Sequence, residues 1–274
     1  MIRGMFSAIS GLKEHQVMLD VTANNLANVN TIGYKGARAT FKDQLQQNVA
    51  GGSAAGATTG GQNAQQIGLG VSLGSVDNLL TSGSLQTTGN PLDVAISGEG
   101  WFRVAQGAPP AAPTSMSYTR AGNFSRNDQG YLVNGEGYYV IGRNPAATTD
   151  SYIQIPTGAS GVTVGNDGAV SYLPAASTTR TTAGTISVAR FPNENGLVRA
   201  SGNRWQADPS SGTEIVGQPG GSNGFTVGGA VEMSNVDLAS EFTNMIVAQR
   251  GFQASSRVIS TSDQILEDLV NLKR

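Results

Sequence analysis

The sequence contains no cysteine and a single histidine among its 274 residues. Transition-metal sites are built mainly from cysteine and histidine side chains, so such a site is excluded, and disulfide bonds cannot form. His15 has neither a nucleophile nor a second metal ligand beside it in the sequence, and we expect it on the solvated face of a helix. We therefore predict no metal, no cofactor and no enzymatic activity.

Charge is also scarce, since only 13% of the residues are charged and the net charge is −2. Lysine and arginine are scattered singly and form no basic face, which argues against a nucleic-acid partner. No apolar run is long enough to cross a membrane, so we expect no membrane insertion. The first apolar positions are interrupted by Ser7, Ser10 and Lys13, which is untypical of a cleaved signal peptide. We expect any export to leave the N-terminus uncleaved.

Three short motifs, one glycine-rich and two acidic, do not fit the ligand-binding loops that they resemble. The stretch GLGVSLG at 68–74 misses the spacing of a dinucleotide-binding loop and precedes no helical pattern. The turns at 127–130 and 166–168 lack the full ligand spacing of a calcium loop. We predict neither ligand.

The N-terminal segment has apolar residues at helical spacing. Steps of three and four residues select Ile2, Met5, Ile9, Leu12, Gln16, Leu19, Ala23 and Leu26. With one polar exception this row is apolar, which predicts an amphipathic helix of about 25 residues.

The C-terminal segment shows a longer pattern of the same kind, with a capping-box start at Ser234 and Asp237 and about 35 residues of helix. Its main stripe comprises Leu238, Phe242, Met245, Gln249, Phe252, Ser256, Ile259, Asp263, Leu266 and Val270. A second apolar row comprises Ala254, Val258, Ile265, Leu269 and Leu272. The helix is therefore apolar over more of its surface than one partner helix needs. An antiparallel helix pair closing an ordinary domain is one explanation, and coiled-coil packing between several copies is the other, which we favour.

The middle of the chain changes to a period of two residues. Short apolar runs alternate with turn signals such as Asn134–Gly135, Asn195–Gly196 and Asn223–Gly224, and 37 glycines fit such a turn-dense region. Residues 107–114 and 174–183 are expected as exposed loops. Residues 50–66 are rich in Gly, Ala, Ser, Thr and Gln, which is typical of a flexible linker. The fold class predicted is α+β, with long terminal helices and a mainly-β domain.

Four blocks of the sequence resemble the bacterial flagellar rod and hook family. They are ANNLANVNTIGYKG (23–36), GNPLDVAISGEGWFRV (89–104), YTRAGNFSRNDQGYLVNGEGYYVIG (118–142) and the segment 233–274. The resemblance implies a subunit of a hollow tubular polymer. It would have a helical inner domain (1–32 with 235–274) that forms a coiled-coil layer, an extended linker (33–75) and an outer β domain (76–234).

The resemblance also implies partners and a location. Many copies would form a homopolymer that joins rod and hook–filament junction proteins, after export by the flagellar type III apparatus and assembly under a hook cap. The location would be the extracellular hook or basal body of the flagellum. The residues expected at the assembly interface are Ile2, Met5, Ile9, Leu12, Leu19, Leu26, Asn24, Asn25, Leu238, Phe242, Met245, Phe252, Ile259, Leu266 and Val270.

Within the family we favour a hook protein, a bendable tube that transmits torque. The ending of the chain and the segment ATFKDQLQQNVAGGS (39–53) resemble short hook proteins, although the chain has no room for the extra outer domain of long ones. The alternative is a distal rod protein, which forms a rigid drive shaft. A protein that caps or joins flagellar segments, and a secreted β-rich enzyme or carbohydrate-binding module, are the other hypotheses.

Overall fold

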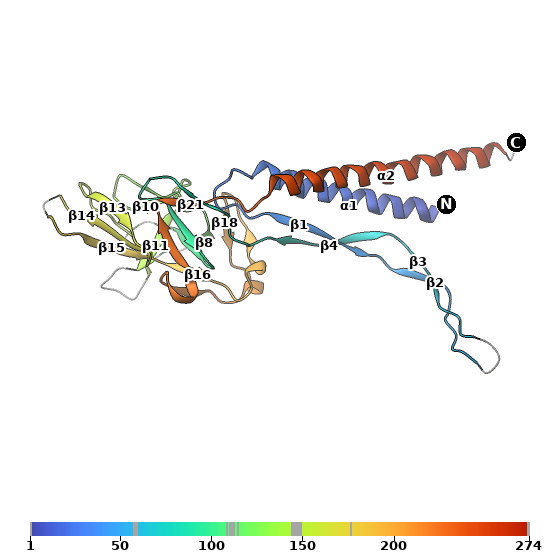
Figure 1. Ribbon diagram of the computed structural model, residues 1–274, viewed down its shortest axis with the longest axis horizontal. Helices are drawn as coiled ribbons and strands as arrows, with labels where there is room; N and C mark the ends of the chain where they lie inside the picture. The colour runs from blue at the N-terminus through green and yellow to red at the C-terminus, as the bar shows by residue number, and fades with distance from the viewer. Residues whose placement is uncertain are drawn as a thin grey trace. The chain divides into compact units, whose positions relative to one another are not determined.

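The computed structural model describes residues 2–56, 60–107, 109, 113, 115–143, 150–175 and 177–272 (Figure 1). The chain divides into two compact units. The helical unit comprises residues 1–27, 37–78 and 237–274, and the β unit comprises residues 28–36 and 79–236. A helix near each end and a mainly-β body confirm the predicted α+β class.

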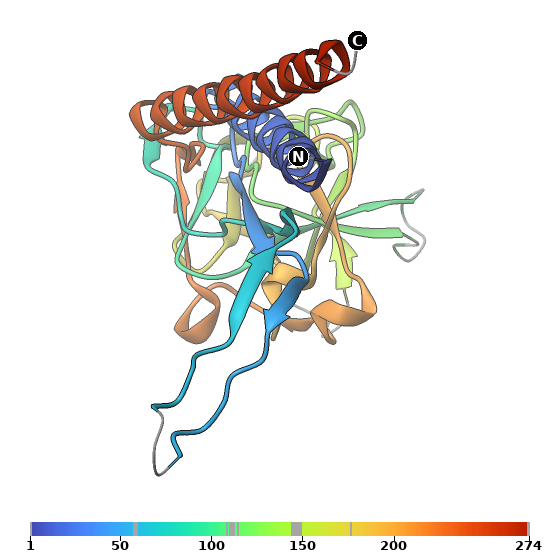
Figure 2. The ribbon, with the colours of Figure 1, turned by 90° about the vertical axis from the view of Figure 1, so that its right-hand side faces the viewer.

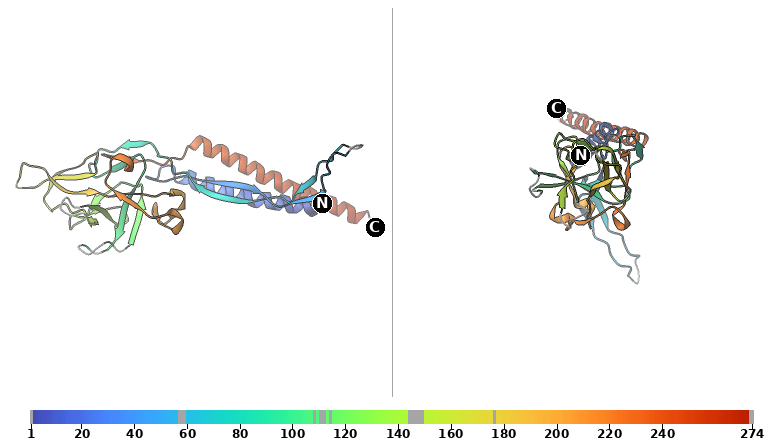
Figure 3. Two further views of the ribbon diagram at one scale, coloured as in Figure 1. Left: turned by 90° about the horizontal axis from the view of Figure 1, so that it is seen from below. Right: turned by 90° about the vertical axis from the view of Figure 1, so that its left-hand side faces the viewer.

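In the helical unit, α1 (Ile2–Ala27) and α2 (Leu238–Asn271) lie side by side (Figures 1 and 3). Two glycines permit their close approach, since a Cβ on Gly11 would lie 3.3 Å from Ser255 Oγ and one on Gly251 would lie 2.4 Å from the His15 ring. The expectation of a solvated His15 is wrong, because its ring is half-buried beside Gly251 and packs edge-on against Phe41, at 6.1 Å between centroids.

The start of α2 also differs in detail from the prediction. Asp237 is the N-cap, and its carboxylate accepts a hydrogen bond from Ala239 N at 3.0 Å and one from Ser240 Oγ at 2.9 Å. Ser234 lies outside the helix and accepts from Val236 N instead. A carboxylate at this end also meets the positive end of the helix dipole, which favours Asp237 as the cap.

The segment expected as an extended linker forms two antiparallel strand pairs in the helical unit. β1 (Ala37–Asp43) pairs with β4 (Val71–Asn78), and β2 (Gln46–Ala50) pairs with β3 (Gln65–Gly68). The β1–β4 ribbon runs along α1, and Ser10 Oγ accepts a hydrogen bond from Val71 N at 3.2 Å (Figure 3). In β2 and β3 the backbone groups pair with each other although no apolar side chain is buried, which is why the composition of residues 50–66 is typical of a linker.

The β unit contains one sheet of thirteen strands and two separate strand pairs, all antiparallel in the described residues. The central path of the sheet is β13-β14-β15-β11-β7-β8-β18-β17. Its strands are β7 (Trp101–Gln106), β8 (Ser115–Thr119), β9 (Ser125–Arg126), β10 (Leu132–Val133), β11 (Tyr139–Arg143), β12 (Asp150–Tyr152), β13 (Ser160–Val164), β14 (Ala169–Leu173), β15 (Thr181–Ile186), β16 (Val188–Arg190), β17 (Val198–Arg199), β18 (Arg204–Gln206) and β19 (Ile215–Gly217).

The strand pairs join distant parts of the sequence. β5 (Leu85–Thr87) pairs with β21 (Ala230–Glu232), and β6 (Val94–Ser97) pairs with β20 (Phe225–Gly228). Three single turns of 3-10 helix, η1 (Glu194–Gly196), η2 (Pro209–Ser211) and η3 (Gly221–Asn223), connect later strands. The last strands of the unit therefore pair with its first ones.

Two apolar clusters fill the β unit. The first gathers β-branched and aromatic side chains of β6, β7, β10, β11 and β14–β16 around Phe102 and Phe124, whose rings meet edge-on at 5.1 Å. The second surrounds Trp101 and Trp205, whose ring centroids are 5.4 Å apart. The alternation of apolar residues seen in the sequence supplies these inward faces.

The two predicted loops have different outcomes. The loop at 174–183 is shorter than predicted, because β15 begins at Thr181 and pairs with β14. Most of the loop at 107–114 lies outside the described residues.

Candidate functional site: the terminal helices and their attachment

A line of half-buried positions along α2 defines the seam of this helix. The seam consists of Glu241, Met245, Ala248, Phe252, Ser255, Ile259, Ser262 and Leu266, at alternating steps of four and three. Large apolar residues recur every seven positions and alternate with small ones. α1 contacts the seam at Glu241, through a 3.2 Å hydrogen bond from Asn25 Nδ2, and at Ser255, opposite Gly11.

Four of the α2 residues predicted at the assembly interface therefore lie in the seam, namely Met245, Phe252, Ile259 and Leu266. The other three, Leu238, Phe242 and Val270, are exposed. The predicted stripe passed through polar positions that are exposed in the structure, whereas the seam uses Ala248, Ser255 and Ser262. Small residues carry too weak an apolar signal to reveal that path in the sequence.

The α1 residues predicted at the interface also differ in exposure. Met5, Leu12, Leu19 and Leu26 are half-buried, while Ile9 is 37% exposed. The side chain of Ile2 lies outside the described residues. Of the paired asparagines, Asn24 is exposed and Asn25 is buried. Contacts between copies stay a prediction for all of these residues.

The helical unit has little core of its own. Among its described residues, the buried apolar side chains are those of Ala8 and Ala248. The second apolar row predicted on α2 is exposed along its whole length, with exposed fractions of 46% at Val258, 49% at Ile265 and 82% at Leu272. Further exposed apolar side chains are Phe6, Phe242, Ile246, Val247, Leu269 and Val270. Apolar surface on this scale normally marks an interaction site.

The β2–β3 pair is an arm without apolar support. Every residue of both strands is exposed, including Val49 and Ile67, and the arm extends away from both helices (Figure 2). A two-stranded hairpin with no packed face is at best marginally stable in water. The arm therefore needs a covering surface to become rigid.

The turn at residues 31–36, which resembles part of the family signature, is held inside the β unit. Gly33 has φ +68°, and a Cβ there would lie 2.5 Å from Ala121 N, so no other residue fits. Tyr34 is buried, and the Arg199 guanidinium lies over its ring at 5.0 Å and over the Trp205 ring at 4.9 Å. The same guanidinium donates to the carbonyls of Lys35 and Gly36.

Lys35 is the centre of a buried ionic network. Its ammonium donates to Glu232 Oε1 at 2.6 Å and to Thr81 O at 2.9 Å, and Arg120 donates to Glu232 Oε2 at 3.2 Å. Burial lowers the pKa of Lys35, against the opposing attraction of Glu232. Glu232 was not predicted from the sequence, because it is 197 residues away from Lys35 and lies in no motif.

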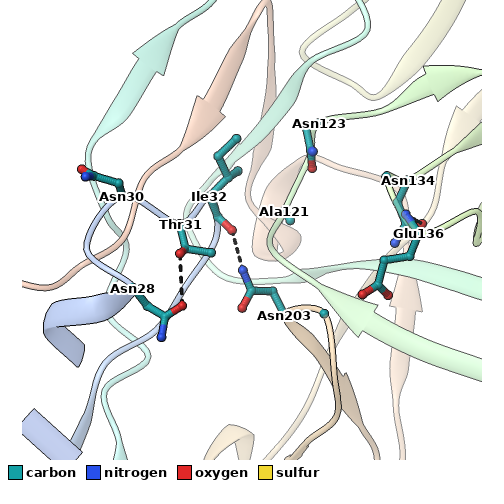
Figure 4. Close-up of a pocket in the computed structure, with 11 residues that line it drawn as sticks. Asn28, Asn30, Thr31, Ile32, Ala121, Asn123, Asn134, Glu136 and Asn203 are labelled. Carbon is teal, nitrogen blue, oxygen red and sulfur yellow. Dashed lines mark hydrogen bonds between the residues drawn. The ribbon is translucent and has the colours of Figure 1, made fainter. Parts of the chain in front are cut away.

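A polar depression of about 530 Å³ lies beside this turn within the β unit (Figure 4). Its lining includes five asparagines, namely Asn28, Asn30, Asn123, Asn134 and Asn203. Asn203 donates to Ile32 O at 3.0 Å, and the carboxylate of Glu136 pairs with Arg204 at 2.7 Å. The lining thus presents amides and one charge-paired carboxylate, without a nucleophile placed beside a base.

The described residues offer neither a metal site nor a membrane span. They contain no group of three or more metal-ligating side chains. Neither helix, over its described residues, combines the length and apolarity that a membrane span requires.

Three family models match successive parts of the chain. Residues 5–35 match "Flagella basal body rod protein", residues 95–172 match "Flagellar hook protein FlgE/F/G D1 domain", and residues 227–272 match "Flagellar basal body rod FlgEFG protein C-terminal". The matches include both terminal helices in large part and the centre of the β unit.

Curated relatives extend the similarity to the whole chain. The flagellar basal-body rod protein FlgG of Bacillus subtilis is 49% identical over 100% of both chains. The protein of the same name from Agrobacterium fabrum is 39% identical, over 96% of this chain and 97% of the relative. The flagellar hook protein FlgE of Borreliella burgdorferi is 26% identical in an alignment of 447 positions that covers both chains completely. Members of this family are structural proteins of the flagellum and not enzymes, and the chain belongs to the flagellar basal-body rod and hook protein family.

Proposed function

We propose that the chain is a subunit of the distal rod, the straight drive shaft of the flagellar basal body. The observation that carries this proposal is full-length identity of 49% with a protein named as a rod protein. The prediction of a hook protein is not confirmed, and the relatives favour the distal rod, which was the alternative.

The lengths of the relatives support the same choice. The alignment with the hook relative spans 447 positions, against 274 residues here, so a large part of that hook protein has no counterpart in this chain. The rod relative from Bacillus subtilis aligns from end to end over 276 positions.

Assembly follows from the surface of the helical unit. Neighbouring copies cover the exposed apolar row of α2 and form the inner, coiled-coil layer of a tube with their own helices. Burying one exposed Leu or Ile side chain contributes roughly 1.5–3 kcal/mol. The row repeats in every subunit, so this gain is multiplied along the polymer. The predicted apolar interface residues that the structure leaves exposed, Ile9, Leu238, Phe242 and Val270, belong to the same contacts.

The β unit supplies the outer layer of the tube. Its two apolar clusters are internal, so it keeps its shape independently of neighbours. The proposal includes the partners and route that the family resemblance implies: export by the flagellar type III apparatus without cleavage, and junctions with other rod proteins and with the hook.

Electron cryotomography of a tagged subunit tests the proposal. We would insert a small electron-dense tag at Thr178, an exposed position between β14 and β15 of the β unit. We expect label along the straight shaft within the cell envelope. Label on the curved segment outside the envelope would identify a hook protein and overturn the proposal. Motility of the tagged strain is the control for normal assembly.

A further inference from the structure

The polar depression of the β unit has the size of a ligand site but not the lining of an apolar one. Its volume of about 530 Å³ lies within the range of roughly 300–1,000 Å³ that is usual for small-ligand sites. Most such sites are lined by hydrophobic and aromatic side chains. Among the described residues that line this depression, the apolar ones are Ile32 and Ala121, and none is aromatic. An apolar ligand would therefore find little surface to cover.

Three side chains of the lining have hydrogen-bonding atoms to spare. Within the described part of the chain, the exposed side chain of Asn123 makes no hydrogen bond. Asn203 donates through Nδ2 to Ile32 O at 3.0 Å, and its Oδ1 has no donor among the described residues. Glu136 uses Oε2 to accept from Arg204 Nε at 2.7 Å, which leaves Oε1 available to a ligand. The side chains of Asn123, Asn203 and Glu136 lie around the same space (Figure 4).

The turns that carry these groups are held in place by the β unit. Asn134 Oδ1 accepts hydrogen bonds from Glu136 N at 3.1 Å and from Tyr138 N at 2.8 Å, which closes the turn that carries Glu136. In the opposite turn Gly202 has φ +70° and Asn203 has φ +54°. A Cβ on Gly202 would collide with the Glu136 carboxylate, so glycine leaves the room that this carboxylate occupies. The site is therefore largely formed before a ligand arrives.

The charge in the depression is compensated. Glu136 is the one charged residue among the described lining residues, and it is paired with the buried Arg204, whose guanidinium lies 3.9 Å from the centroid of the Tyr138 ring. An anion such as phosphate therefore meets no available cation in this lining. A calcium ion needs six to eight oxygen ligands, and the described residues contain no group of three or more metal-ligating side chains. The chemistry favours a neutral ligand that both donates and accepts hydrogen bonds.

We propose that this depression binds a neutral saccharide. Each hydroxyl of a sugar both donates and accepts, so neighbouring hydroxyls can pair at once with the amide of Asn123, with Asn203 Oδ1 and with Glu136 Oε1. An extended peptide is the other neutral polar ligand, but it is usually bound along a free strand edge, and the lining residues lie in turns and connections outside the strands. The inference concerns the β unit alone and holds for a rod or a hook subunit.

Titration of the soluble full-length chain with chitotriose and, separately, with maltotriose tests the inference by NMR. The first probe carries acetamido groups and the second carries hydroxyls alone, so the pair distinguishes two kinds of neutral saccharide. We expect at least one of them to bind with a Kd of about 1 mM or tighter and to shift the side-chain amide signals of Asn123 and Asn203. Asn123→Ala should weaken binding by about three- to tenfold, because it removes hydrogen bonds to the ligand and none within the described protein.

Two further variants make the test specific. Asn195→Ala removes an exposed asparagine of the same unit outside the depression and should leave the affinity unchanged. Glu136→Gln keeps the size of the side chain but loses the stronger, charged acceptor, and it should weaken binding. Failure of both saccharides to bind, or binding that Asn123→Ala and Glu136→Gln leave unchanged, overturns the inference. Binding of a peptide of residues 46–66 that is lost in Asn123→Ala also overturns it, because the depression would then be a contact between copies.

Discussion

The two units of this chain obtain their stability in different ways. The β unit encloses two clusters of large apolar side chains and a buried ionic network, and its chain returns on itself through β5–β21 and β6–β20. In its described part the helical unit buries two apolar side chains, those of Ala8 and Ala248, and it exposes apolar rows on α2. The β unit therefore has a core of its own, whereas the helical unit has little, and we propose that neighbouring copies complete it.

The largest effect expected is loss of assembly from a charge on the exposed row of α2. Leu269→Asp places a carboxylate where we propose that a neighbouring copy packs, and burial of an unpaired charge there would cost several kcal/mol per subunit. We expect no polymer by sedimentation and electron microscopy, with the unfolding temperature of the β unit unchanged. Leu269→Met keeps the apolar volume and polymerises. Normal polymers from Leu269→Asp would show that this row is not covered by neighbours.

A large change in stability is expected in the β unit from Glu232→Ala. Removing this fully buried carboxylate leaves Lys35 and Arg120 without their partner, which costs about 3–5 kcal/mol. Denaturant unfolding followed by tryptophan fluorescence measures the loss, since both tryptophans lie in the β unit. The control is Glu99→Gln, which breaks the more exposed pair with Arg190 in the same unit and costs about 0–1 kcal/mol. Equal losses in the two variants would show that the buried network contributes no more to the stability of the β unit than an exposed ion pair does.

A smaller effect is expected where the two helices approach. Gly251→Ala pushes a methyl group against the His15 ring and destabilises the helical unit by about 1–3 kcal/mol, as overpacking does. Gly4→Ala is the matched control, because nothing lies within 4 Å of its added Cβ and alanine favours the helix by up to about 1 kcal/mol. Thermal melting of the helical signal at 222 nm in the assembled protein compares them. A stabilising Gly251→Ala would show that the helices do not pack closely there.

The smallest effect is a pH dependence at Glu241. Burial raises its pKa in the folded chain, partly opposed by the hydrogen bond from Asn25. The unfolded chain therefore releases this proton first, so the contribution of Glu241 to stability falls as pH rises from the ordinary carboxyl pKa through the raised one. Glu241→Gln removes this dependence, and the difference in helix melting between parent and variant should grow over that window. A difference in melting temperature that is constant with pH would show that the Glu241 carboxyl is solvated.

Periodicity predicted the elements that depend on local pattern. The apolar steps from Ile2 to Leu26 and from Leu238 to Val270 predicted both helices, and alternation with Asn-Gly turns predicted most strands of the β unit. Periodicity did not predict the pairing of β1 with β4. This pairing is made by backbone hydrogen bonds, which require no particular side chains and therefore leave little pattern in the sequence.

The site was less predictable because it depends on residues far apart in the sequence. The seam runs through Ala248, Ser255 and Ser262, which carry little apolar signal, and Lys35 pairs with Glu232, which is 197 residues away in the sequence. Tyr34 and Lys35 lie in a block that resembles the family signature, and the structure shows that both side chains are buried. Burial of both side chains fixes the turn from which β1 departs.

Hydrogen exchange followed by mass spectrometry, on the soluble chain and on its polymer, tests the central claim most directly. We expect the amides of β7, β8 and β11 to be protected equally in both forms. The amides of α1 and α2 should exchange rapidly in the soluble chain and become protected in the polymer. Equal protection of the two helices in the soluble chain and in the polymer would show that the helical unit is stable by itself and would contradict the claim.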